Sequence, residues 1–573
     1  MLDTQLIEAE PAPATQQWYR RPRVWTWIAF GLTALVFAEL AWRRRWMSDD
    51  GLIVLRTVQN ILDGNGPVFN AGERVEANTS TLWTVIVTLG GLIPGVRLEW
   101  AAVISGLLCA VGGLVLAMDG ARRLYRPTGR AFMLPAGALL VCALSPFRDF
   151  ATSGLETGLI SLWLGGTWWM VVRRAIGDTE RSWPVALVLG LGPLVRPDMA
   201  LFSAIAFAAL LFLAWRGWPR MLGLFAVAGA LPLAYQIFRM GYYGLITPNT
   251  ALAKEASAVH WDRGLRYLAD FGSPYLLWLP VLVLAGTFAL LVRQGPRNRL
   301  FFVLTAFPLV AGLAMALYVI RIGGDFMHGR MLLPALFAAL LPVMAVPFTR
   351  WTALAVAGVG AWAVVAVGWL RVPYEDTAKH YNAATGIADE RGYWSAASGL
   401  EHPMYGEDYS AAMGLPEALA VLHDSPSPTL LIAHNGIWLR YTSDQPYSTL
   451  VVGSIGALGR VAPLDARIHD VYGLVSPVAA HAEMAVAGRS GHEKDLPPAW
   501  DVAEATQVTT GTPDLVPQSE IAAAKLALQC PRIQEMLGSV RAPLTAGRFW
   551  DNLTGAFGRS ALRYPAVPGP GCP

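Results

Sequence analysis

Long apolar runs, separated by short polar and arginine-rich connections, fill the first two thirds of the chain and then stop. A helix needs about twenty consecutive apolar residues to cross the hydrocarbon core of a bilayer. With slightly shorter runs allowed inside a packed bundle, the pattern predicts about eleven transmembrane helices. The predicted spans are residues 24–42, 99–118, 131–145, 158–172, 183–195, 200–215, 222–238, 275–292, 300–320, 331–348 and 351–370.

One further apolar run, residues 82–93, is short and is interrupted by Gly90 and Gly91. If this run does not cross the membrane, most arginine-rich connections fall on the cytoplasmic side, as the positive-inside rule requires. We therefore predict a surface or re-entrant helix here. The cytoplasmic arginines would be Arg122, Arg123, Arg126, Arg130, Arg173, Arg174, Arg216, Arg220, Arg293, Arg297 and Arg299. The arginines at 43–45 fall outside, against the rule.

The composition changes after Leu370, where Pro, Asp, His and Ser replace the long apolar runs. We expect a transmembrane domain at 1–371 and a soluble domain at 372–573, which an odd number of helices and a cytoplasmic N-terminus place outside the cell. Short β-type stretches at 429–433 and 448–453 predict a mixed α/β structure in this second domain. The predicted fold class is a mainly α-helical polytopic membrane protein with an extracytoplasmic mixed α/β domain.

Composition supports the membrane assignment: 54% of the 573 residues are hydrophobic and only 15% are charged. A net charge of +3 gives no reason to expect nucleic acid as a partner. The first apolar run is too long and begins too late for a cleavable signal peptide, so we expect it to remain as an anchor. Cys109 and Cys142 lie in apolar runs, whereas Cys530 and Cys572 lie in the polar last third. The second pair could form a disulfide if that part is extracytoplasmic.

Acidic side chains are concentrated on the predicted outer face. Charged groups at a membrane are costly and often functional, so this asymmetry suggests extracytoplasmic chemistry, although acidic residues also simply tolerate the outside. The outer set is Asp49, Asp50, Asp63, Glu73, Glu76, Asp149, Glu156, Asp198, Glu255, Asp262, Asp270 and Asp325. The inner connections contain Asp119, Asp178 and Glu180.

The first outer loop contains the adjacent carboxylates Asp49 and Asp50. Neighbours on a helix point about 100° apart, so the two cannot face one atom. One could accept the proton of an acceptor hydroxyl while the other orients a loop or binds a cation. Alternatively, Ser48, Asp49 and Asp50 could cap the helix that starts near Gly51.

Six outer motifs together resemble the GT-C glycosyltransferases, and they span the whole predicted membrane domain. The motifs are Asp49-Asp50, Asn78-Thr79-Ser80-Thr81-Leu82-Trp83, Ser153-Gly154-Leu155-Glu156-Thr157, Arg196-Pro197-Asp198, Thr247-Pro248-Asn249-Thr250 and Gly323-Gly324-Asp325-Phe326-Met327-His328-Gly329-Arg330. Chain length and the C-terminal stretches 470–474 and 491–494 are most similar to the AftB arabinofuranosyltransferase family of mycobacteria and corynebacteria.

The resemblance implies a multi-pass enzyme of the bacterial plasma membrane with its active site outside. Its donor would be decaprenyl-phosphoryl-arabinofuranose, and it would add terminal β-(1→2)-linked arabinofuranose to the arabinan of arabinogalactan and lipoarabinomannan. A lipid-phosphate donor fits the absence of a P-loop, a dinucleotide glycine motif and an Asp-x-Asp metal motif. We expect a monomer that requires no cofactor, with a divalent cation as an alternative to the protein's own cations.

The resemblance also suggests roles for individual residues. Asp49 and Asp50 are the candidate catalytic groups. Candidates for the donor phosphate are Arg239, Lys254, His328 and Arg330, although Arg239 could instead anchor the chain at the membrane interface. Candidates for binding sugar or acceptor are Asn78, Thr79, Trp83, Glu156, Asn249 and Asp325. Glu156, Arg196 and Asp198 could instead form a structural ion network.

Three other functions compete with this interpretation. A transporter of lipid-linked sugars would share the helices and buried charges, but no inverted repeat is visible in the sequence. A mannosyltransferase with a polyprenyl-phosphate donor and a non-catalytic cell-wall scaffold are the other two. We expect the C-terminal domain to bind the acceptor, with Trp500 and Trp550 either stacking on sugars or packing in the domain's own core.

Overall fold

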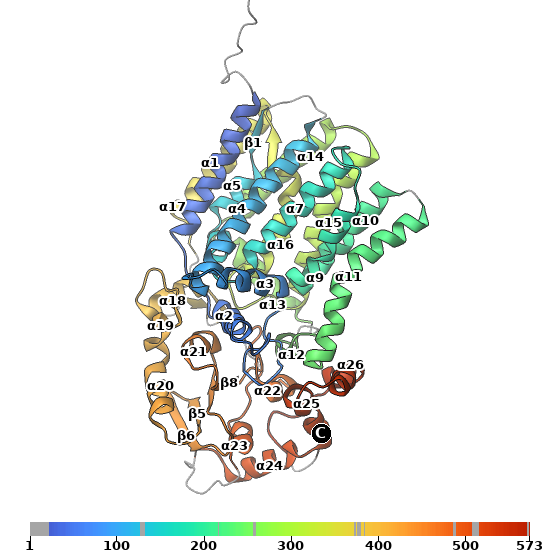
Figure 1. Ribbon diagram of the computed structural model, residues 1–573. Helices are drawn as coiled ribbons and strands as arrows, with labels where there is room; N and C mark the ends of the chain where they lie inside the picture. The colour runs from blue at the N-terminus through green and yellow to red at the C-terminus, as the bar shows by residue number, and fades with distance from the viewer. Residues whose placement is uncertain are drawn as a thin grey trace, which may run out of the picture.

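The computed structural model describes residues 22–126, 132–215, 217–255, 259–371, 374, 380–382, 384–484, 489–506, 515–569 and 572. Figure 1 shows a long helical bundle with a mixed helix and sheet region at one end. The described chain begins at the far end of the bundle, and its last residues lie in the mixed region. The mainly helical character and the C-terminal sheet agree with the sequence prediction.

The helices of the bundle differ widely in length. The longer ones are α1 (Pro22–Trp42), α4 (Leu98–Leu124), α7 (Thr157–Ala175), α10 (Ala200–Ala214), α11 (Trp218–Tyr243), α14 (Trp278–Gln294), α15 (Arg299–Arg321) and α17 (Arg350–Gly368). The shorter ones are α5 (Gly137–Ala143), α6 (Ser145–Phe150), α8 (Trp183–Gly190), α9 (Gly192–Val195) and α16 (Leu333–Leu340). Three 3₁₀ turns join them: η3 (Pro197–Met199), η4 (Arg330–Leu332) and η5 (Leu341–Val343).

Within the described residues, 6 helices are long and apolar enough to cross a bilayer. They are α1, α4, η3 continued by α10, α11, α15 and α17. The other predicted spans fall on α5, α7, α8 with α9, α14 and α16, which do not meet the same requirements of length and hydropathy. The structure therefore supports a membrane protein with several spans, and the count of eleven remains a prediction.

Two predicted spans are not continuous helices. Residues 131–145 and 331–348 meet in a short antiparallel pair, β1 (Met133–Pro135) and β2 (Ala345–Pro347). Pro135 and Pro347 have no backbone N–H, so they cannot donate to a continuing helix. The strand pair satisfies neighbouring backbone groups instead, which is the physical reason that the prediction of uninterrupted helices was wrong here.

The short run at 82–93 forms a helix at the end of the bundle nearest the mixed region. This helix, α3 (Thr81–Gly91), lies across the direction of the long helices in Figure 1. At the opposite end, the guanidinium of Arg122 lies over Trp27 at 5.4 Å from the ring centre, which is within cation–π range. At the near end, Arg44 pairs with Asp149. That ion pair gives Arg44, one of the exceptions to the charge rule, a compensating carboxylate.

The C-terminal region has a four-stranded sheet flanked by helices. The sheet order is β6 (Ile437–Thr442), β5 (Thr429–His434), β7 (Thr449–Val452) and β8 (Arg467–Asp470). β5 pairs antiparallel with β6 and parallel with β7, which pairs parallel with β8, so the strands predicted at 429–433 and 448–453 are confirmed. A further strand pair consists of β3 (Tyr381–Asn382) and β4 (Ile387–Ala388).

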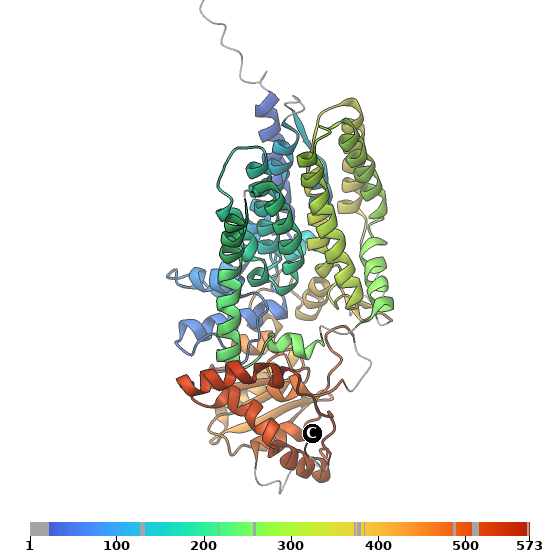
Figure 2. The same ribbon diagram turned by 90° about the vertical axis from the view of Figure 1, so that its right-hand side faces the viewer.

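Helices flank this sheet, and those from the end of the chain, in red, lie in front of it in Figure 2. They are α18 (Glu390–Ser398), α19 (Gly406–Tyr409), α20 (Leu415–Asp424), α21 (Ile455–Val461), α22 (Pro477–His481), α23 (Ala499–Ala505), α24 (Gln518–Leu528), α25 (Pro531–Arg541) and α26 (Ala546–Ser560), with the 3₁₀ turn η6 (Ala411–Met413). α26 lies across the end of α11 (Figure 2), and Asn552 donates to the carbonyl of Gly241 at 3.1 Å.

The bundle and the C-terminal region share one hydrophobic core rather than merely touching. Trp46 and Leu55 belong to the same buried cluster as Trp394 and Leu458. The fully buried Arg56 of α2 (Asp49–Leu62) reinforces this junction, donating to the carbonyl of Gly459 at 2.7 Å. A buried guanidinium is tolerated only when its donors are satisfied, so this contact fixes the C-terminal region onto α2.

Candidate functional site

A cavity of about 230 Å³ lies where the bundle meets the C-terminal region. It gathers residues from all six motifs singled out in the sequence. Its lining consists of Asp50, Ile53, Ala77, Asn78, Thr79, Leu155, Glu156, Arg196, Pro197, Asp198, Thr250, Ala251, Lys254, Tyr318, Ile322, Gly324, Asp325, Arg330, Met331, Leu474, Ser490 and Gly491. The sixth motif, Asp49-Asp50, contributes its second carboxylate, so every motif reaches this one space.

The start of α2 sets the directions of the two adjacent carboxylates. Ser48 is the N-cap, and its hydroxyl accepts a hydrogen bond from the N–H of Gly51 at 2.9 Å. A Cβ on Gly51 would lie 2.7 Å from the carbonyl oxygen of Ser153, so glycine allows this close packing. Because Ser48 performs the capping, Asp49 and Asp50 are free to bind partners elsewhere.

Asp49 points away from the cavity and into the C-terminal region. Its carboxylate accepts hydrogen bonds from the backbone N–H groups of Gly456 and Ala457, at 3.1 and 2.9 Å, at the start of α21. A Cβ on Gly456 would lie 1.8 Å from the Asp49 carbonyl oxygen. Burial raises the pKa of Asp49 to about 6, although the two N–H groups oppose that rise. Asp49 therefore joins the two parts of the protein.

Asp50 lines the cavity. A guanidinium nitrogen of Arg330 lies 3.4 Å from its carboxylate, and the same arginine donates through Nε to Asp325 at 2.7 Å. Burial of the Asp50 carboxyl would raise its pKa, but the positive charges of Lys254 and Arg330 outweigh burial and hold the pKa below its usual value. Asp50 is therefore a carboxylate that stays ionised at neutral pH.

Glu156, Arg196 and Asp198 form an ion network in the cavity wall. Arg196 donates from Nε and a terminal nitrogen to the two carboxylate oxygens of Asp198 at 2.6 and 2.7 Å, and its other terminal nitrogen lies 3.4 Å from Glu156. The two-pronged pair with Asp198 is the stronger contact. The interpretation of these residues as an ion network is borne out, and Glu156 remains the less engaged carboxylate of the three.

Lys254 supplies a cation that no carboxylate neutralises at contact distance. Among the described residues, no Asp or Glu oxygen lies within 4.0 Å of its ammonium nitrogen. Nearby, the side-chain oxygens of Asn78 and Thr250 are buried without a hydrogen-bond partner. Buried polar atoms usually have partners, so these two oxygens are unsatisfied hydrogen-bonding groups of residues that line the cavity.

Several other predicted site residues lie outside this cavity and have structural partners. Arg239 pairs with Glu76 at 2.6 Å, and His328 contacts Asp270 at 2.6 Å and Tyr275 at 3.1 Å. Because these partners already satisfy them, neither faces the space in which a donor phosphate would meet Asp50. The placement does not support their expected role as phosphate ligands.

Trp83 and Asn249 shape the wall without reaching the cavity. The indole N–H of Trp83 donates to the carbonyl of Gly154 at 2.8 Å, and the amide of Asn249 donates to the carbonyl of Gly473 at 2.7 Å. Both side chains are buried. They hold motif segments together, whereas Asn78 and Thr79 from the same motif line the cavity.

Some cavity neighbours were not predicted from the sequence. Burial, and then the nearby Asp50, raise the pKa of Glu390 well above its usual value, and one of its carboxylate oxygens is buried without a partner. Ser490 and Gly491 bring the C-terminal region into the cavity wall. Gly491 belongs to the stretch 491–494 that carried a sequence signal. Glu390 and Ser490 lie outside every recognisable motif.

No group of three or more His, Cys, Asp or Glu side chains arranged to hold a metal ion occurs in the described part of the chain. The carboxylates of the cavity are instead matched by Arg196, Lys254 and Arg330. These cations are the groups available to a phosphate.

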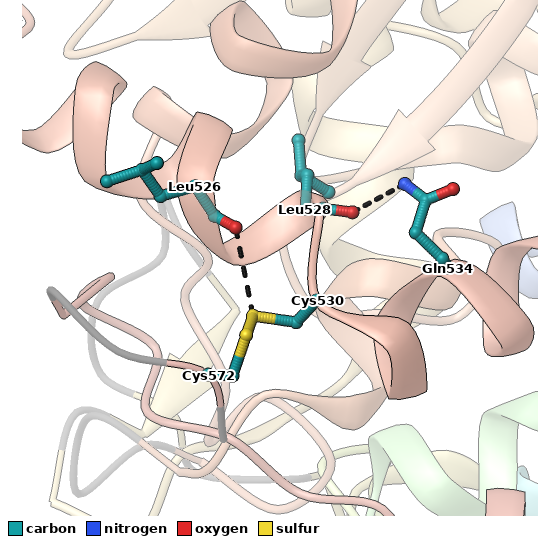
Figure 3. Close-up of a disulfide and its surroundings, with 5 residues drawn as sticks. All are labelled: Leu526, Leu528, Cys530, Gln534 and Cys572. Atoms are coloured by element: carbon teal, nitrogen blue, oxygen red, sulfur yellow. Dashed lines mark hydrogen bonds between the residues drawn. A yellow bond between two sulfur atoms is a disulfide. The ribbon is translucent and has the colours of Figure 1, made fainter.

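Cys530 and Cys572 form a disulfide, with Cα atoms 5.4 Å apart, as expected (Figure 3).

Trp500 is only 2% exposed and donates to the carbonyl of Ala566 at 2.7 Å. Its expected alternative role in sugar stacking is therefore wrong, because its ring is inside the core. Trp550 is 62% exposed on α26.

Comparison with known proteins gives consistent matches. A family model described as the AftB family C-terminal domain matches residues 438–562. A terminal β-(1→2)-arabinofuranosyltransferase of Mycobacterium tuberculosis is 39% identical, over 95% of this chain and 96% of the relative. A protein of the same name from Corynebacterium glutamicum is 36% identical, over 91% of this chain and 84% of the relative. No solved structure matches this chain.

Proposed function

Because this chain belongs to the family of terminal β-(1→2)-arabinofuranosyltransferases, we propose that it moves arabinofuranose from decaprenyl-phosphoryl-arabinofuranose to the non-reducing ends of cell-wall arabinan. The observation that carries the proposal is the convergence of Asp50, Asn78, Glu156, Lys254 and Arg330 on one cavity. This set offers a carboxylate, a free cation and polar groups for a sugar in one space.

We assign the reacting sugar carbon to the space beside Asp50. An ionised carboxylate suits the positive charge that develops on a sugar ring as its bond to phosphate breaks. A lowered pKa makes Asp50 a weak base but a persistent anion, which favours attack on the anomeric carbon or charge stabilisation over proton removal. If donor and product are both β-linked, a covalent sugar ester on Asp50 would explain retention through two successive displacements.

The leaving phosphate would bind Lys254, with Arg330 close enough to share its charge. In the first displacement the bond between the anomeric carbon and the phosphate oxygen breaks while the bond to Asp50 forms. In the second, the acceptor hydroxyl oxygen attacks the anomeric carbon and displaces the Asp50 carboxylate. The hydroxyl proton passes to the departed phosphate or to Glu156. Tyr318 and Ile322 give the same cavity an apolar wall that suits the first isoprene units of the donor.

The cavity would open on the extracytoplasmic side of the bacterial plasma membrane. Two observations support this orientation: Arg122 and its neighbours lie at the opposite end of the bundle, and the C-terminal region contains the disulfide between Cys530 and Cys572. Arginines favour the cytoplasmic side, and disulfides persist in oxidising compartments.

Purified protein in lipid nanodiscs tests this proposal with a radiolabelled polyprenyl-phosphoryl-arabinofuranose and a synthetic arabinofuranose tetrasaccharide. We expect a labelled pentasaccharide with a terminal β-(1→2) linkage, established by NMR. Transfer only from the matching mannose donor would support the mannosyltransferase alternative. Movement of intact donor across vesicles without bond cleavage would support a transporter, and either result would overturn the proposal.

A further inference from the structure

A second cavity of about 180 Å³ adjoins the candidate active site. Asp325 and Ser490 line both cavities, so the two spaces meet at these residues. The other residues that line the second cavity are Arg263, Arg266, Tyr267, Gly323, Ala384, Thr385 and Ile387. Its walls come from α13 (Trp261–Gly272) on the bundle side and from residues 384–387 and 490 of the C-terminal region.

α13 places this cavity beside the membrane surface rather than within the membrane. Trp261, Leu265 and Leu268 are exposed along one side of the helix, whereas Tyr267 and Phe271 are buried against the bundle. Arg263 and Arg266 lie on the remaining side and line the cavity. A helix with separate apolar and charged sides typically lies in the membrane interface, so its arginine side faces water and the C-terminal region.

The charges around this cavity are already compensated. Arg263 pairs with Glu493 at 2.6 Å, Arg266 pairs with Asp262 at 2.7 Å, and Asp325 pairs with Arg330 at 2.7 Å. A phosphate would have to compete with these carboxylates. In contrast, the Nε of Arg263 is buried without a partner, and the hydroxyls of Thr385 and Ser490 lie nearby, so the lining can bind neutral hydroxyl groups.

We propose that this second cavity binds the arabinofuranose residues of the acceptor next to the one that is extended. The inference rests on the proposed function and assigns the acceptor to the cavity beyond Asp325 and Ser490, whereas the unpaired cation Lys254 lines only the first cavity. A neutral polyol fits a polar, charge-balanced cavity, whereas the anionic phosphate of the donor fits Lys254. The acceptor chain would leave towards water past Ala384, an exposed residue of the lining.

Ala384→Trp tests this assignment, because Ala384 is exposed in a turn and a large ring there would fill the cavity without removing any charge. We expect the KM for an arabinofuranose tetrasaccharide to rise at least about tenfold, with the donor KM changed less than about twofold. Arg266→Gln, a smaller change, should raise the acceptor KM in the same direction.

Ala546→Trp is the matched control, since Ala546 is also exposed but begins α26 away from both cavities. Binding of the tetrasaccharide, followed by saturation-transfer NMR, should weaken in Ala384→Trp and not in the control. This readout needs no turnover, so it separates failure of the acceptor site from failure of the proposed reaction. A selective rise in donor KM, or unchanged acceptor binding in both Ala384→Trp and Arg266→Gln at normal melting temperature, would overturn the assignment.

Discussion

The carboxylate of Asp49 accepts a hydrogen bond from the backbone N–H of Ala457, 2.9 Å away and separated from it by 408 positions in the chain. The next residue, Asp50, lies in the cavity beside Arg330. Adjacent helix positions diverge by about 100°, so one carboxylate docks the C-terminal region while the other faces the cavity. Two consecutive residues thereby link the assembly of the protein to its proposed chemistry.

Asp49→Asn should alter how stability depends on pH. Burial raises the pKa of Asp49 from 3.8 to about 6, so between these values the folded protein holds a proton that the unfolded chain has released. Stability from this group is therefore lost as pH rises through this window. The variant lacks this titration. The melting temperature of Asp49→Asn minus that of the wild type should therefore increase by roughly a few degrees between pH 4 and pH 7. A difference independent of pH would contradict this explanation.

Lys254→Gln should weaken donor binding selectively. Lys254 is a cation that has no paired carboxylate, so its removal should raise the donor KM at least about tenfold. The acceptor KM should stay close to that of the wild type. Steady-state kinetics with each substrate varied in turn measure both constants. His328→Gln serves as the comparison, because His328 contacts Asp270 outside the cavity, and it should lower the melting temperature without a selective effect on the donor. Equal donor KM values in the two variants would refute the assignment.

Removing the disulfide should destabilise the C-terminal region. The two cysteines lie 42 residues apart, for which the chain-entropy model gives a stabilisation of about 4 kcal/mol. A Cys530→Ser, Cys572→Ser double variant should therefore unfold at a lower temperature by differential scanning fluorimetry. Dithiothreitol should lower the melting temperature of the wild type and leave the variant unchanged. A variant with wild-type stability would rule out this contribution.

Orientation can be measured with reporter fusions. Alkaline phosphatase folds to an active form only outside the cytoplasm, so a fusion after Pro573 should be active. Fusions after Arg123 and after Arg174 should be inactive, because α4 and α7 end beside the start of α1: Arg122 lies over Trp27, and Arg123 lies over Trp169 near the end of α7. Activity in the opposite pattern would invert the proposed topology.

Much of the architecture could be predicted from hydrophobic patterning, because the long apolar helices, the short helix α3 and the strands β5 and β7 each have strong local signals. The strand pair of β1 and β2 could not, because it depends on contact between segments far apart in the sequence. A pattern of apolar residues records burial and not the identity of the distant partner.

The candidate site could be predicted in outline but not in detail. Sequence motifs identified Asp50, Asn78 and Arg330, which the structure brings to one cavity with the predicted phosphate ligand Lys254. They also suggested His328, whose partners Asp270 and Tyr275 become visible only in three dimensions. The direction of a side chain follows from helix phase and packing, and a motif alone fixes neither.

Transfer rates of Asp50→Asn and Asp49→Asn, measured with purified proteins and a synthetic polyprenyl-phosphoryl-arabinofuranose, test the central claim most directly. Asparagine keeps the size of the side chain but removes the charge. We predict a loss of at least about a hundredfold for Asp50→Asn at unchanged melting temperature, and a clearly smaller loss for Asp49→Asn. A near-native rate in Asp50→Asn, or equal losses in the two variants, would contradict the assignment of Asp50 to the reacting sugar.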